Sequence, residues 1–549
     1  MNETAASSRE WDAVIVGTGP GGATLGHALA AAGWSVLFCE MGKSSLTDLK
    51  TLRGGYPEMS AVASTLPVSE RLLSGGRYPR VINDLSGDRA KQFVPFIGAG
   101  TGGSSALYGM VLERFFPADF EPGGQYPEAI GASLPGRWPI GYADLLPYYE
   151  VAERLYRVRG GGDPLRGEAP RERVGVSPPM SAAARELADG LARQGLHPYQ
   201  LPLACEFVPG CRGCQGFLCG ANCKNDSARV CLEPAVVRHG AHLLDECEVV
   251  RVEADRERVT GLVCSRGGRE FRVAGRVVVL AAGALSTPSL LLRSQSAAWP
   301  NGVGNGSGLV GKNLMRHFID LYAVFPRARP APGGNAKEFG FNDLYQTDTG
   351  KLGTVQSFGE LPPGAMIADD LQRDLRHAVH PFVAAAFGVV KPVVRPVLDR
   401  IFSRATILAT MIEDLPYPDN CVLPPSVASG AAPVTVSIRY TVRKPEARRI
   451  AAMRSRMKAL LAPWRYLLIK QAENNERIAH ACGTCRFGDD PRSSVLDANN
   501  RCHELRNLYI VDASFFPSSA GTNPALTIAA NALRVADHLL GRPAAKVAA

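Results

Sequence analysis

The chain has 549 residues, of which 46% are hydrophobic and 21% are charged, and it includes 57 glycines and 40 prolines. These totals are typical of a globular protein with two or more domains, and they exclude collagen-like and intrinsically disordered classes. The net charge is +9, but the 61 basic and 52 acidic residues are mixed along the chain, with no run of five like charges. Nucleic-acid binding is therefore disfavoured.

The sequence predicts a cytoplasmic protein without a membrane span. Residues 1–10 are polar and no stretch of 18 apolar residues occurs, whereas signal peptides and transmembrane helices require long apolar segments. The most membrane-like segment, residues 382–411, is interrupted by charges that include Lys391, Asp399 and Arg404. We expect a helix pair there, with a membrane-surface face as the alternative.

The N-terminal residues predict a compact βαβ unit. Residues 12–16 form a short apolar run that is typical of a buried parallel strand. Residues 23–32 have the composition of a helix that ends at Gly33, and residues 35–38 form a second apolar strand.

Three glycines in the turn after the first strand predict the binding of a dinucleotide. Gly17, Gly19 and Gly22 can supply a tight turn, close approach of the backbone to a pyrophosphate, and close packing of helix on strand. The phosphates would lie at the helix N-terminus, where free N–H groups favour anions. Glu40 follows the second strand and is placed to accept hydrogen bonds from a ribose diol.

The rest of the chain predicts a nucleotide-binding fold that is interrupted by two insertions. Residues 45–230 contain many Gly- and Pro-rich connections, and residues 320–475 are less regular than the rest. The expected elements are antiparallel strands at 246–254, 259–264 and 270–273, a buried strand at 276–281, a strand near 434–440 and a helix at about 445–462.

Five ordered motifs carry a resemblance to a known family. They are residues 12–40; Gly102-Gly-Ser-Ser105 followed by Gly109-Met110; residues 280–294; Val310-Gly-Lys-Asn-Leu314 closing on His317; and residues 480–540. In this order they resemble the motifs of the glucose-methanol-choline (GMC) oxidoreductases, which are FAD-dependent alcohol oxidases and dehydrogenases. Residues 320–475 match only diffusely, in the region where that family varies with its substrate.

The resemblance implies an α/β (α+β) fold in which a Rossmann-like FAD-binding domain is interrupted by a substrate-binding domain with an antiparallel sheet and helices. The expected FAD-binding domain comprises residues 8–45, 232–320 and 478–549, with a flavin-covering loop at 95–115. The expected substrate-binding domain comprises residues 46–231 and 321–477, including a cysteine-rich loop at 205–231.

The resemblance also implies the residues that bind FAD. Asp512 and Ala513 would lie along the phosphate and ribityl chain, and the helix from about Pro524 would direct its N-terminus at the flavin. The expected cofactor-binding residues are Gly17, Gly19, Gly22, Glu40, Gly102, Gly103, Ser104, Ser105, Val250, Ala282, Asp512, Ala513, Asn523, Pro524 and Thr527.

The chain departs from the family pattern at two positions and lacks a residue for covalent flavin attachment. Tyr108 stands where the first signature commonly has asparagine, which affects packing at the flavin edge, and Gln295 stands where a glycine is usual after the second signature. No histidine or cysteine occurs at residues 98–104, so we expect non-covalent FAD.

By resemblance, His480 and Asn523 are the catalytic residues. A histidine suits removal of a hydroxyl proton because its pKa lies near the working pH. Asparagine cannot act as a base, so Asn523 would orient or stabilise the substrate oxygen. The alternatives are a structural buried histidine at 480 and a helix-capping role for Asn523. We expect His317, His503 and His538 to be solvent-facing or structural.

A cluster of cysteines needs a separate explanation. Six of the 13 cysteines are clustered, namely Cys205, Cys211, Cys214, Cys219, Cys223 and Cys231. Of these, Cys211, Cys214, Cys219 and Cys223 are candidate ligands of zinc or an iron–sulfur cluster, since thiolates bind both. By resemblance, some membrane-coupled sugar dehydrogenases of the family carry a three-iron cluster on similarly spaced cysteines. Plain reduced thiols and local disulfides are the alternatives, although a cytoplasmic location disfavours disulfides.

The sequence therefore predicts FAD-dependent oxidation of an alcohol to an aldehyde or ketone, with hydride transfer to flavin N5 and His480 as the base. We expect a small-molecule substrate, a sugar-like or natural-product alcohol, because residues 320–475 have no long apolar lining. The electron acceptor would be oxygen, a quinone or a redox protein. The rival functions are a non-oxidative flavin lyase or isomerase, and an iron–sulfur-containing electron-transfer subunit.

Overall fold

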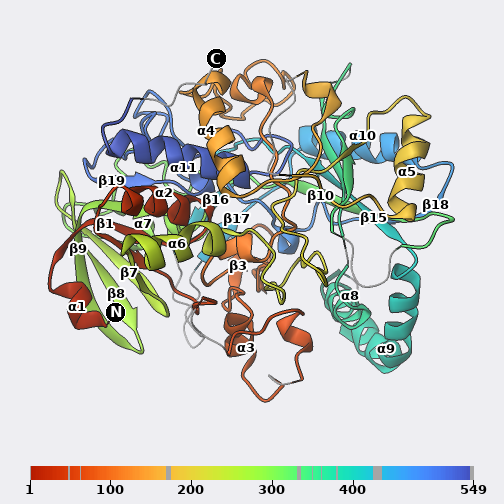
Figure 1. The fold of residues 1–549 in the computed structure, drawn as a ribbon, viewed down its shortest axis with the longest axis horizontal. Coiled ribbons are helices and arrows are strands. Elements are labelled where there is room, and N and C mark those ends of the chain that lie inside the picture. The colour runs from red at the N-terminus through yellow and green to blue at the C-terminus, as the bar shows by residue number, and fades with distance from the viewer. Residues whose placement is uncertain are drawn as a thin grey trace.

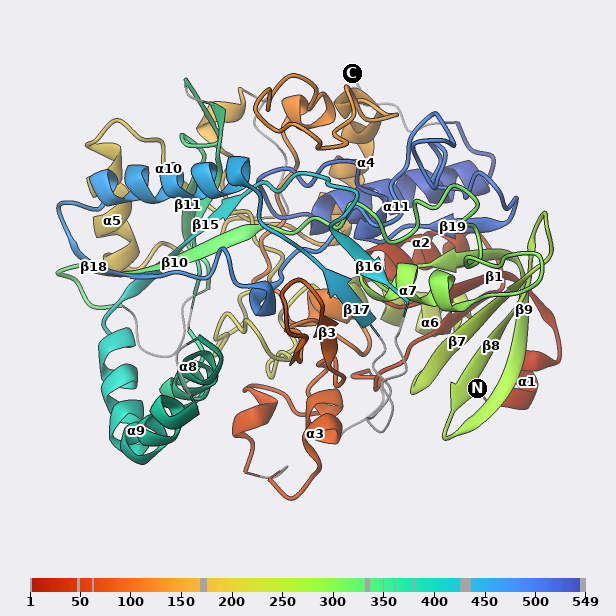
Figure 2. The ribbon, with the colours of Figure 1, turned by 180° about the vertical axis from the view of Figure 1, so that it is seen from behind.

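The computed structural model describes residues 2–46, 50–61, 64–167, 175–330, 336–348, 350–359, 361–378, 381–424 and 436–543. In the described part, the strands form two large sheets that lie on opposite sides of the molecule, with smaller sheets between and around them (Figure 1). The rear view shows the same separation and the helical hairpin that projects beside the second large sheet (Figure 2).

The first large sheet is built around the predicted βαβ unit. Its strands run in the order β6 (His242–Leu244), β2 (Val36–Cys39), β1 (Glu10–Val16), β9 (Arg269–Leu280), β8 (Val259–Arg266) and β7 (Cys247–Ala254), and β19 (Leu508–Ile510) also pairs with β9. β1 pairs in parallel with both β2 and β9. Helix α2 (Pro20–Ala31) follows β1 directly, as the sequence predicts.

Strand β9 replaces two strands that the sequence analysis expected separately, at 270–273 and 276–281. It is one continuous strand whose first half pairs antiparallel with β8 and whose second half pairs in parallel with β1. Ala274 and Gly275 do not break it, because both pair with residues of β1. Partners on a neighbouring strand keep the backbone extended where local sequence alone suggests a break.

The second large sheet is antiparallel. Its order is β18 (Arg465–Ile469), β10 (Phe318–Phe325), β15 (Thr406–Ile412), β14 (Gly353–Ser357), β11 (Phe339–Phe341) and β5 (Tyr199–Gln200). A four-stranded sheet has the order β16 (Cys421–Leu423), β17 (Val436–Arg439), β3 (Ile82–Asp84) and β4 (Lys91–Phe93), and β12 (Gln346–Thr347) pairs with β13 (Gly350–Lys351).

Helices cover the sheets and connect them. The remaining α-helices are α1 (Glu3–Ser7), α3 (Val68–Ser74), α4 (Tyr142–Leu155), α5 (Ala182–Ala192), α6 (Glu233–His239), α7 (Ser286–Arg293), α8 (Gly364–Ala378), α9 (Pro381–Phe402), α10 (Lys444–Leu460) and α11 (Ala525–Leu539). The short helical turns are η1 (Pro57–Met59), η2 (Gly103–Ala106), η3 (Pro117–Phe120), η4 (Pro164–Arg166), η5 (Ala228–Leu232), η6 (Asn475–Arg477) and η7 (Ala513–Phe515). Helix α11 packs against α2 and α4, so the two ends of the chain share one hydrophobic core.

The segment at 382–411 differs from the expected helix pair. Its first part is helix α9, which pairs with the preceding α8, but its second part is β15, a central strand of the second large sheet. All seven residues of β15 are buried, so the apolar run at its end serves the sheet core. Among the described residues, no helix is long and apolar enough to cross a membrane.

Candidate active site

The glycine turn after β1 allows backbone segments to approach one another closely. Gly17 has a φ of +97°, and a Cβ added there would lie 2.5 Å from the carbonyl oxygen of Ala281. A Cβ on Gly22 would lie 2.2 Å from the carbonyl oxygen of Gly17. Any larger residue at either position would separate α2 from the strands that it covers.

Gly19 is different, because its missing Cβ faces open space. Apart from its neighbours in the chain, none of the described residues has an atom within 4 Å of the position that a Cβ on Gly19 would take. Gly19 is also the N-cap residue of α2 and offers no side-chain cap to the helix. A helix N-terminus that is open and uncapped suits a phosphate group, so these residues fit the pyrophosphate of FAD.

The predicted flavin-covering loop packs onto this turn. A Cβ on Gly103 would lie 3.0 Å from the Cα atom of Gly19, and Gly102 has a φ of +90°. The hydroxyl of Ser105 donates to the carbonyl oxygen of Gly102 at 2.7 Å, while the hydroxyl of Ser104 accepts from the backbone N–H of Gly98. The loop is therefore fixed by its own hydrogen bonds over the predicted phosphate site.

Glu40 is buried and held by protein groups. Its carboxylate accepts hydrogen bonds from the backbone N–H and hydroxyl of Thr18, and from the backbone N–H groups of Gly42 and Gly100. Burial raises the pKa of this carboxyl, although these hydrogen bonds act in the opposite direction. Its contact with a ribose stays a prediction, and its observed role is to join the glycine turn to the loop at Gly100.

The C-terminal cofactor residues meet the same edge of the first sheet. Asp512 accepts hydrogen bonds from the hydroxyl of Thr287 at 2.6 Å and from the backbone N–H of Gly283 at 2.9 Å. Thr527, in the first turn of α11, shares a hydrogen bond with the hydroxyl of Tyr149. Val250 lies at a register shift in β7. Ala282 is the second residue after the end of β9, and Ala513 is the first residue of η7.

His480 forms a pair with a second histidine. The Nδ1 atoms of His480 and His317 lie 2.9 Å apart, and their rings meet edge to face. His480 has a φ of +55°, which is uncommon for a residue with a side chain and is retained mainly where surrounding contacts require it. Of the two alternatives expected for His317, solvent-facing or structural, its exposure of 2% excludes the first.

The hydrogen bonds of His317 define where the protons of the pair lie. Its Nε2 atom is 3.1 Å from the carbonyl oxygen of Ser519 and 3.0 Å from that of Ala520. Carbonyl oxygens only accept, so Nε2 of His317 carries a proton. Burial lowers the pKa of His317 to about 4, so near neutral pH the ring is neutral and its Nδ1 is unprotonated.

The consequence for His480 is a defined tautomer. Because Nδ1 of His317 is the acceptor, Nδ1 of His480 is the donor across the 2.9 Å contact. The neutral ring of His480 then has an unprotonated Nε2, the atom that can accept a proton from another molecule. Burial first, and then the charges of His317 and Lys337, lower the pKa of His480 well below its usual value.

A buried ionic network fixes the backbone that holds His317. The backbone N–H of Ala520 donates to Oε1 of Glu413 at 3.0 Å, and the ammonium of Lys351 lies between Glu413 and Asp119. Ala520 itself has a φ of +55°. The carbonyl groups that orient His317 are therefore held from behind by paired charges.

Asn523 is oriented by a glutamine of the second large sheet. Its Oδ1 atom accepts a hydrogen bond of 2.6 Å from Nε2 of Gln356, which lies on β14. The N-cap of α11 is Pro524 and has no side-chain cap, so Asn523 does not cap that helix. Among the described residues, the amide N–H₂ of Asn523 has no acceptor, and the buried Oε1 of Gln356 has no donor.

The structure brings most of the cysteine cluster together. The sulfurs of Cys205, Cys211 and Cys223 all lie within 4.8 Å of one another, and Cys219 lies 3.6 Å from Cys223. All 13 cysteines are unpaired thiols. The set favours Cys205 over Cys214 as a third neighbour of Cys211 and Cys223, because a turn at residues 205–211 returns Cys205 to the group.

Sequence reasoning missed His317 as a partner of His480. The motif at 310–314 lies close to His317 in sequence and could have indicated it, but 163 positions separate the two histidines and only the fold brings them together.

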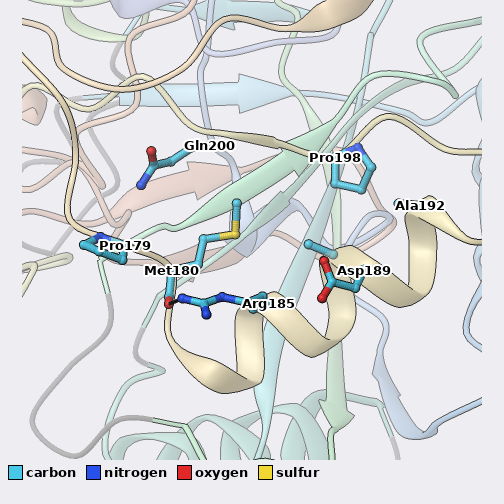
Figure 3. A pocket seen from close by; sticks show the side chains of 8 residues that line it. Pro179, Met180, Arg185, Asp189, Ala192, Pro198 and Gln200 are labelled. Atoms are coloured by element: carbon cyan, nitrogen blue, oxygen red, sulfur yellow. Dashed lines mark hydrogen bonds between the residues drawn. The ribbon is translucent and has the colours of Figure 1, made fainter.

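A pocket elsewhere, beside α5 and including Met180, Arg185 and Gln200, contains none of the predicted site residues (Figure 3).

Comparison with known proteins identifies the family to which both the N-terminal and the C-terminal parts of the chain belong. Two family models, both described as GMC oxidoreductase, match residues 12–319 and 429–532. Paromamine 6'-oxidase from Streptomyces fradiae is 31% identical over 98% of this chain and 93% of its own length. 6'''-Hydroxyparomomycin C oxidase from Streptomyces lividus is 32% identical over 99% of this chain and 95% of its own.

A solved structure shows the same fold. Pyridoxine 4-oxidase from Mesorbium loti superposes with a TM-score of 0.63 at 20% identity and covers 97% of this chain and 100% of its own. The chain belongs to the GMC oxidoreductases, a family of flavoproteins that use FAD. It is an enzyme that oxidises alcohol groups.

Proposed function

We propose that this enzyme oxidises a hydroxyl group of a polar, sugar-like small molecule, with His480 as the base and Asn523 as the group that holds the substrate oxygen. The observation that carries the proposal is the hydrogen-bond arrangement of the histidine pair. It leaves Nε2 of His480 unprotonated near neutral pH, as a general base requires.

His480 removes the proton and Asn523 binds the substrate oxygen. Nε2 of His480 accepts the hydroxyl proton as the carbon loses hydride, and the positive charge that forms on the ring spreads toward His317. The amide N–H₂ of Asn523 donates to the substrate oxygen, since Gln356 already occupies its carbonyl side. Bound FAD supplies the hydride acceptor in this reaction.

The residues around Asn523 support a polar substrate. The hydroxyl of Thr522 donates to Glu113, which also accepts from the hydroxyl of Tyr199. The buried Oε1 of Gln356 has no hydrogen-bond donor among the described residues, and a substrate hydroxyl can provide one. Two relatives that match nearly the whole chain are named as oxidases of paromamine and of a hydroxyparomomycin, which are polar compounds of this general kind.

The residues at the glycine turn support non-covalent FAD. The loop over Gly19 carries Ser104 and Ser105 rather than a histidine or cysteine, so it offers no usual point of covalent attachment. We expect acid precipitation of the protein to release all of the yellow cofactor into the supernatant. Flavin that stays with the pellet would contradict this part of the proposal.

The test of the function is an anaerobic screen of alcohols for bleaching of the flavin. At least one polyol or sugar should bleach it, and oxygen, a quinone analogue and a one-electron acceptor, added in turn, would then identify the acceptor. An oxidised aldehyde or ketone product distinguishes this reaction from a lyase or isomerase. Failure of every alcohol to bleach the flavin of a fully loaded enzyme would contradict the proposal.

A second proposal concerns the cysteine-rich loop, which we propose binds a soft metal or an iron–sulfur cluster. Its support is the grouping of Cys205, Cys211 and Cys223 within 4.8 Å, since thiolates at such separations are common ligands of these centres. Metal and sulfide analysis of protein purified without oxygen should give about one equivalent of a bound centre. Metal-free protein in which all six cysteines of the loop titrate as free thiols would refute it.

A further inference from the structure

Lys337 is a buried lysine that no role described so far requires. It lies just before β11 and is 8% exposed. Among the described residues, no carboxylate lies within ion-pair distance of its ammonium, and no hydrogen-bond acceptor contacts it. The ring of Phe358 lies 5.3 Å from its Nζ atom. A buried charge without a counter-charge costs free energy, and a bound anion would offset that cost.

The side chain of Lys337 passes over the flavin-covering loop. A Cβ on Gly109 would lie 2.5 Å from Cε of Lys337 and 3.0 Å from Oε1 of Gln215. The lysine thus reaches this position only because residue 109 has no side chain. Gly109 immediately precedes Met110 and closes the loop that begins at Gly102.

The ammonium also lies near the face of β14 that carries Gln356, because it approaches the ring of Phe358. Phe358 follows β14 two residues after Gln356, and residues two apart in an extended strand share a face. Gln356 contacts Asn523 directly. The charge of Lys337 is also close enough to act on His480. The contact of Lys337 with Phe358 and its approach to Gly109 therefore place it between the flavin-covering loop and the strand from which Gln356 reaches Asn523.

We propose that Lys337 binds an anionic group of the substrate, so that the preferred substrate is an alcohol that also carries a carboxylate or phosphate. This proposal rests on the proposed oxidation and specifies its substrate class. The ammonium has three donors and no acceptor, and an anion would give it a counter-charge that none of the described residues provides. An ammonium-bearing substrate at this position would be repelled.

An anionic substrate would distinguish this enzyme from the relatives named as oxidases of paromamine and of a hydroxyparomomycin. A substrate with several amino groups, such as an aminoglycoside, brings positive charge toward a lysine that no described carboxylate neutralises. Two positive charges a few ångströms apart in a buried site repel strongly. The shared fold and base therefore do not imply a shared substrate charge.

The test uses four polyols that share one carbon skeleton and differ in charge. Glucitol is neutral, gluconate carries a carboxylate, glucitol 6-phosphate carries a phosphate, and glucamine carries an ammonium. Binding to the FAD-loaded enzyme is measured without oxygen from the perturbation of the flavin spectrum. We expect at least one of the two anions to bind about tenfold or more tightly than glucitol, and glucamine to bind more weakly.

Lys337→Met removes the charge and keeps the length of the side chain. It should weaken binding of the preferred anion by about tenfold to a hundredfold and narrow the difference between gluconate and glucamine. The exposed Lys458→Met is the matched control and should leave all four affinities unchanged. Thermal unfolding with bound flavin checks that both variants are folded.

Gly109→Ala tests the geometry without removing the charge. The added methyl group would displace Cε of Lys337, so this variant should also lose preference for the anion. Equal affinities for the four polyols in the unmodified enzyme, or an anion preference that survives Lys337→Met, overturns the proposal. Neither result affects the proposed oxidation, which instead depends on whether any alcohol bleaches the flavin.

Discussion

Lys337 and Lys351 are both buried in residues 321–477, the predicted substrate-binding domain, and they differ in what surrounds the ammonium. Lys351 contacts Asp119 at 2.5 Å and also pairs with Glu413. Burial alone would lower its pKa, but these two carboxylates raise the pKa well above its usual value. Burial without such partners lowers the pKa of Lys337 to about 8.

In this molecule the presence of a counter-charge, rather than burial alone, distinguishes buried groups that support the structure from buried groups that are candidates for the active site. The compensated group around Lys351 holds the backbone of Ala520 and so orients His317. The uncompensated groups are Lys337, His317 and His480, and each has a lowered pKa. Buried groups that lack an internal counter-charge are those that a substrate or a reaction can use.

The largest expected effect is on the rate of flavin reduction, and it follows from removal of His480, the proposed base. His480→Ala should slow reduction of the flavin by alcohol by about 10²–10⁴-fold, because nothing else in the pair presents an unprotonated nitrogen to the substrate. Stopped-flow absorbance without oxygen measures it. The exposed His239→Ala is the control, and full-rate flavin reduction in His480→Ala would remove the basis for the assignment.

Next in size is the removal of charge from the compensated group. Lys351→Met leaves Asp119 and Glu413 buried without their partner and should destabilise the protein by about 3–5 kcal/mol. Lys337→Met removes an unpaired charge and should cost no stability. Chemical unfolding of both variants measures the contrast, and equal losses of stability would mean that pairing does not distinguish the two lysines.

A smaller effect is expected when the orientation of the base is disturbed. His317→Leu removes the acceptor of the His480 Nδ1 proton and should lower the rate of flavin reduction by about tenfold to a hundredfold, with little change in substrate affinity. His317→Gln can present an oxygen to the same proton and should recover part of the rate. If the two variants behave alike, His317 acts only through packing.

The smallest effect on the rate of flavin reduction is expected with pH. Since the folded-state pKa of His480 lies well below its usual value, the rate of flavin reduction should stay flat as the pH falls through 6.5 and decline only in more acid solution. Stability should behave differently. His317 has a pKa of about 4 when folded and about 6.5 when unfolded, so the unfolded state binds more protons between these values.

The sign of the stability change follows from that difference. Stability conferred by the neutral, buried His317 is present above pH 6.5 and is lost as the pH falls toward 4, by roughly 3 kcal/mol in total. Urea unfolding at several pH values measures it. The loss should shrink in His317→Gln, and an unchanged pH dependence in that variant would assign the effect to other groups.

The sequence predicted the nucleotide-binding half well because its signals are local. The strand, glycine turn, helix and second strand of the βαβ unit are each defined by residues within one short segment. The antiparallel strands predicted at 246–254 and 259–264 are confirmed as β7 and β8. The strand at 406–412 was not predicted, because its burial depends on neighbours far along the chain.

The candidate site was predicted in part. His480 and Asn523 belong to one continuous C-terminal block, so the motif alone identifies them. His317 and Lys337 carry no comparable signal, because their importance depends on a contact with a residue more than a hundred positions away or on the absence of a counter-charge. Neither the distant contact nor the missing counter-charge can be predicted from the residues adjacent in sequence.

By itself, the sequence determined the family and the flavin chemistry. It also led to the proposal that His480 rather than Asn523 is the base, since only an imidazole can take up a proton near neutral pH. The tertiary structure decided which nitrogen of His480 is unprotonated and which of two buried lysines has a counter-charge. Both depend on hydrogen-bond and ion-pair partners that come from distant segments, and only the folded chain brings those partners within about 3 Å of one another.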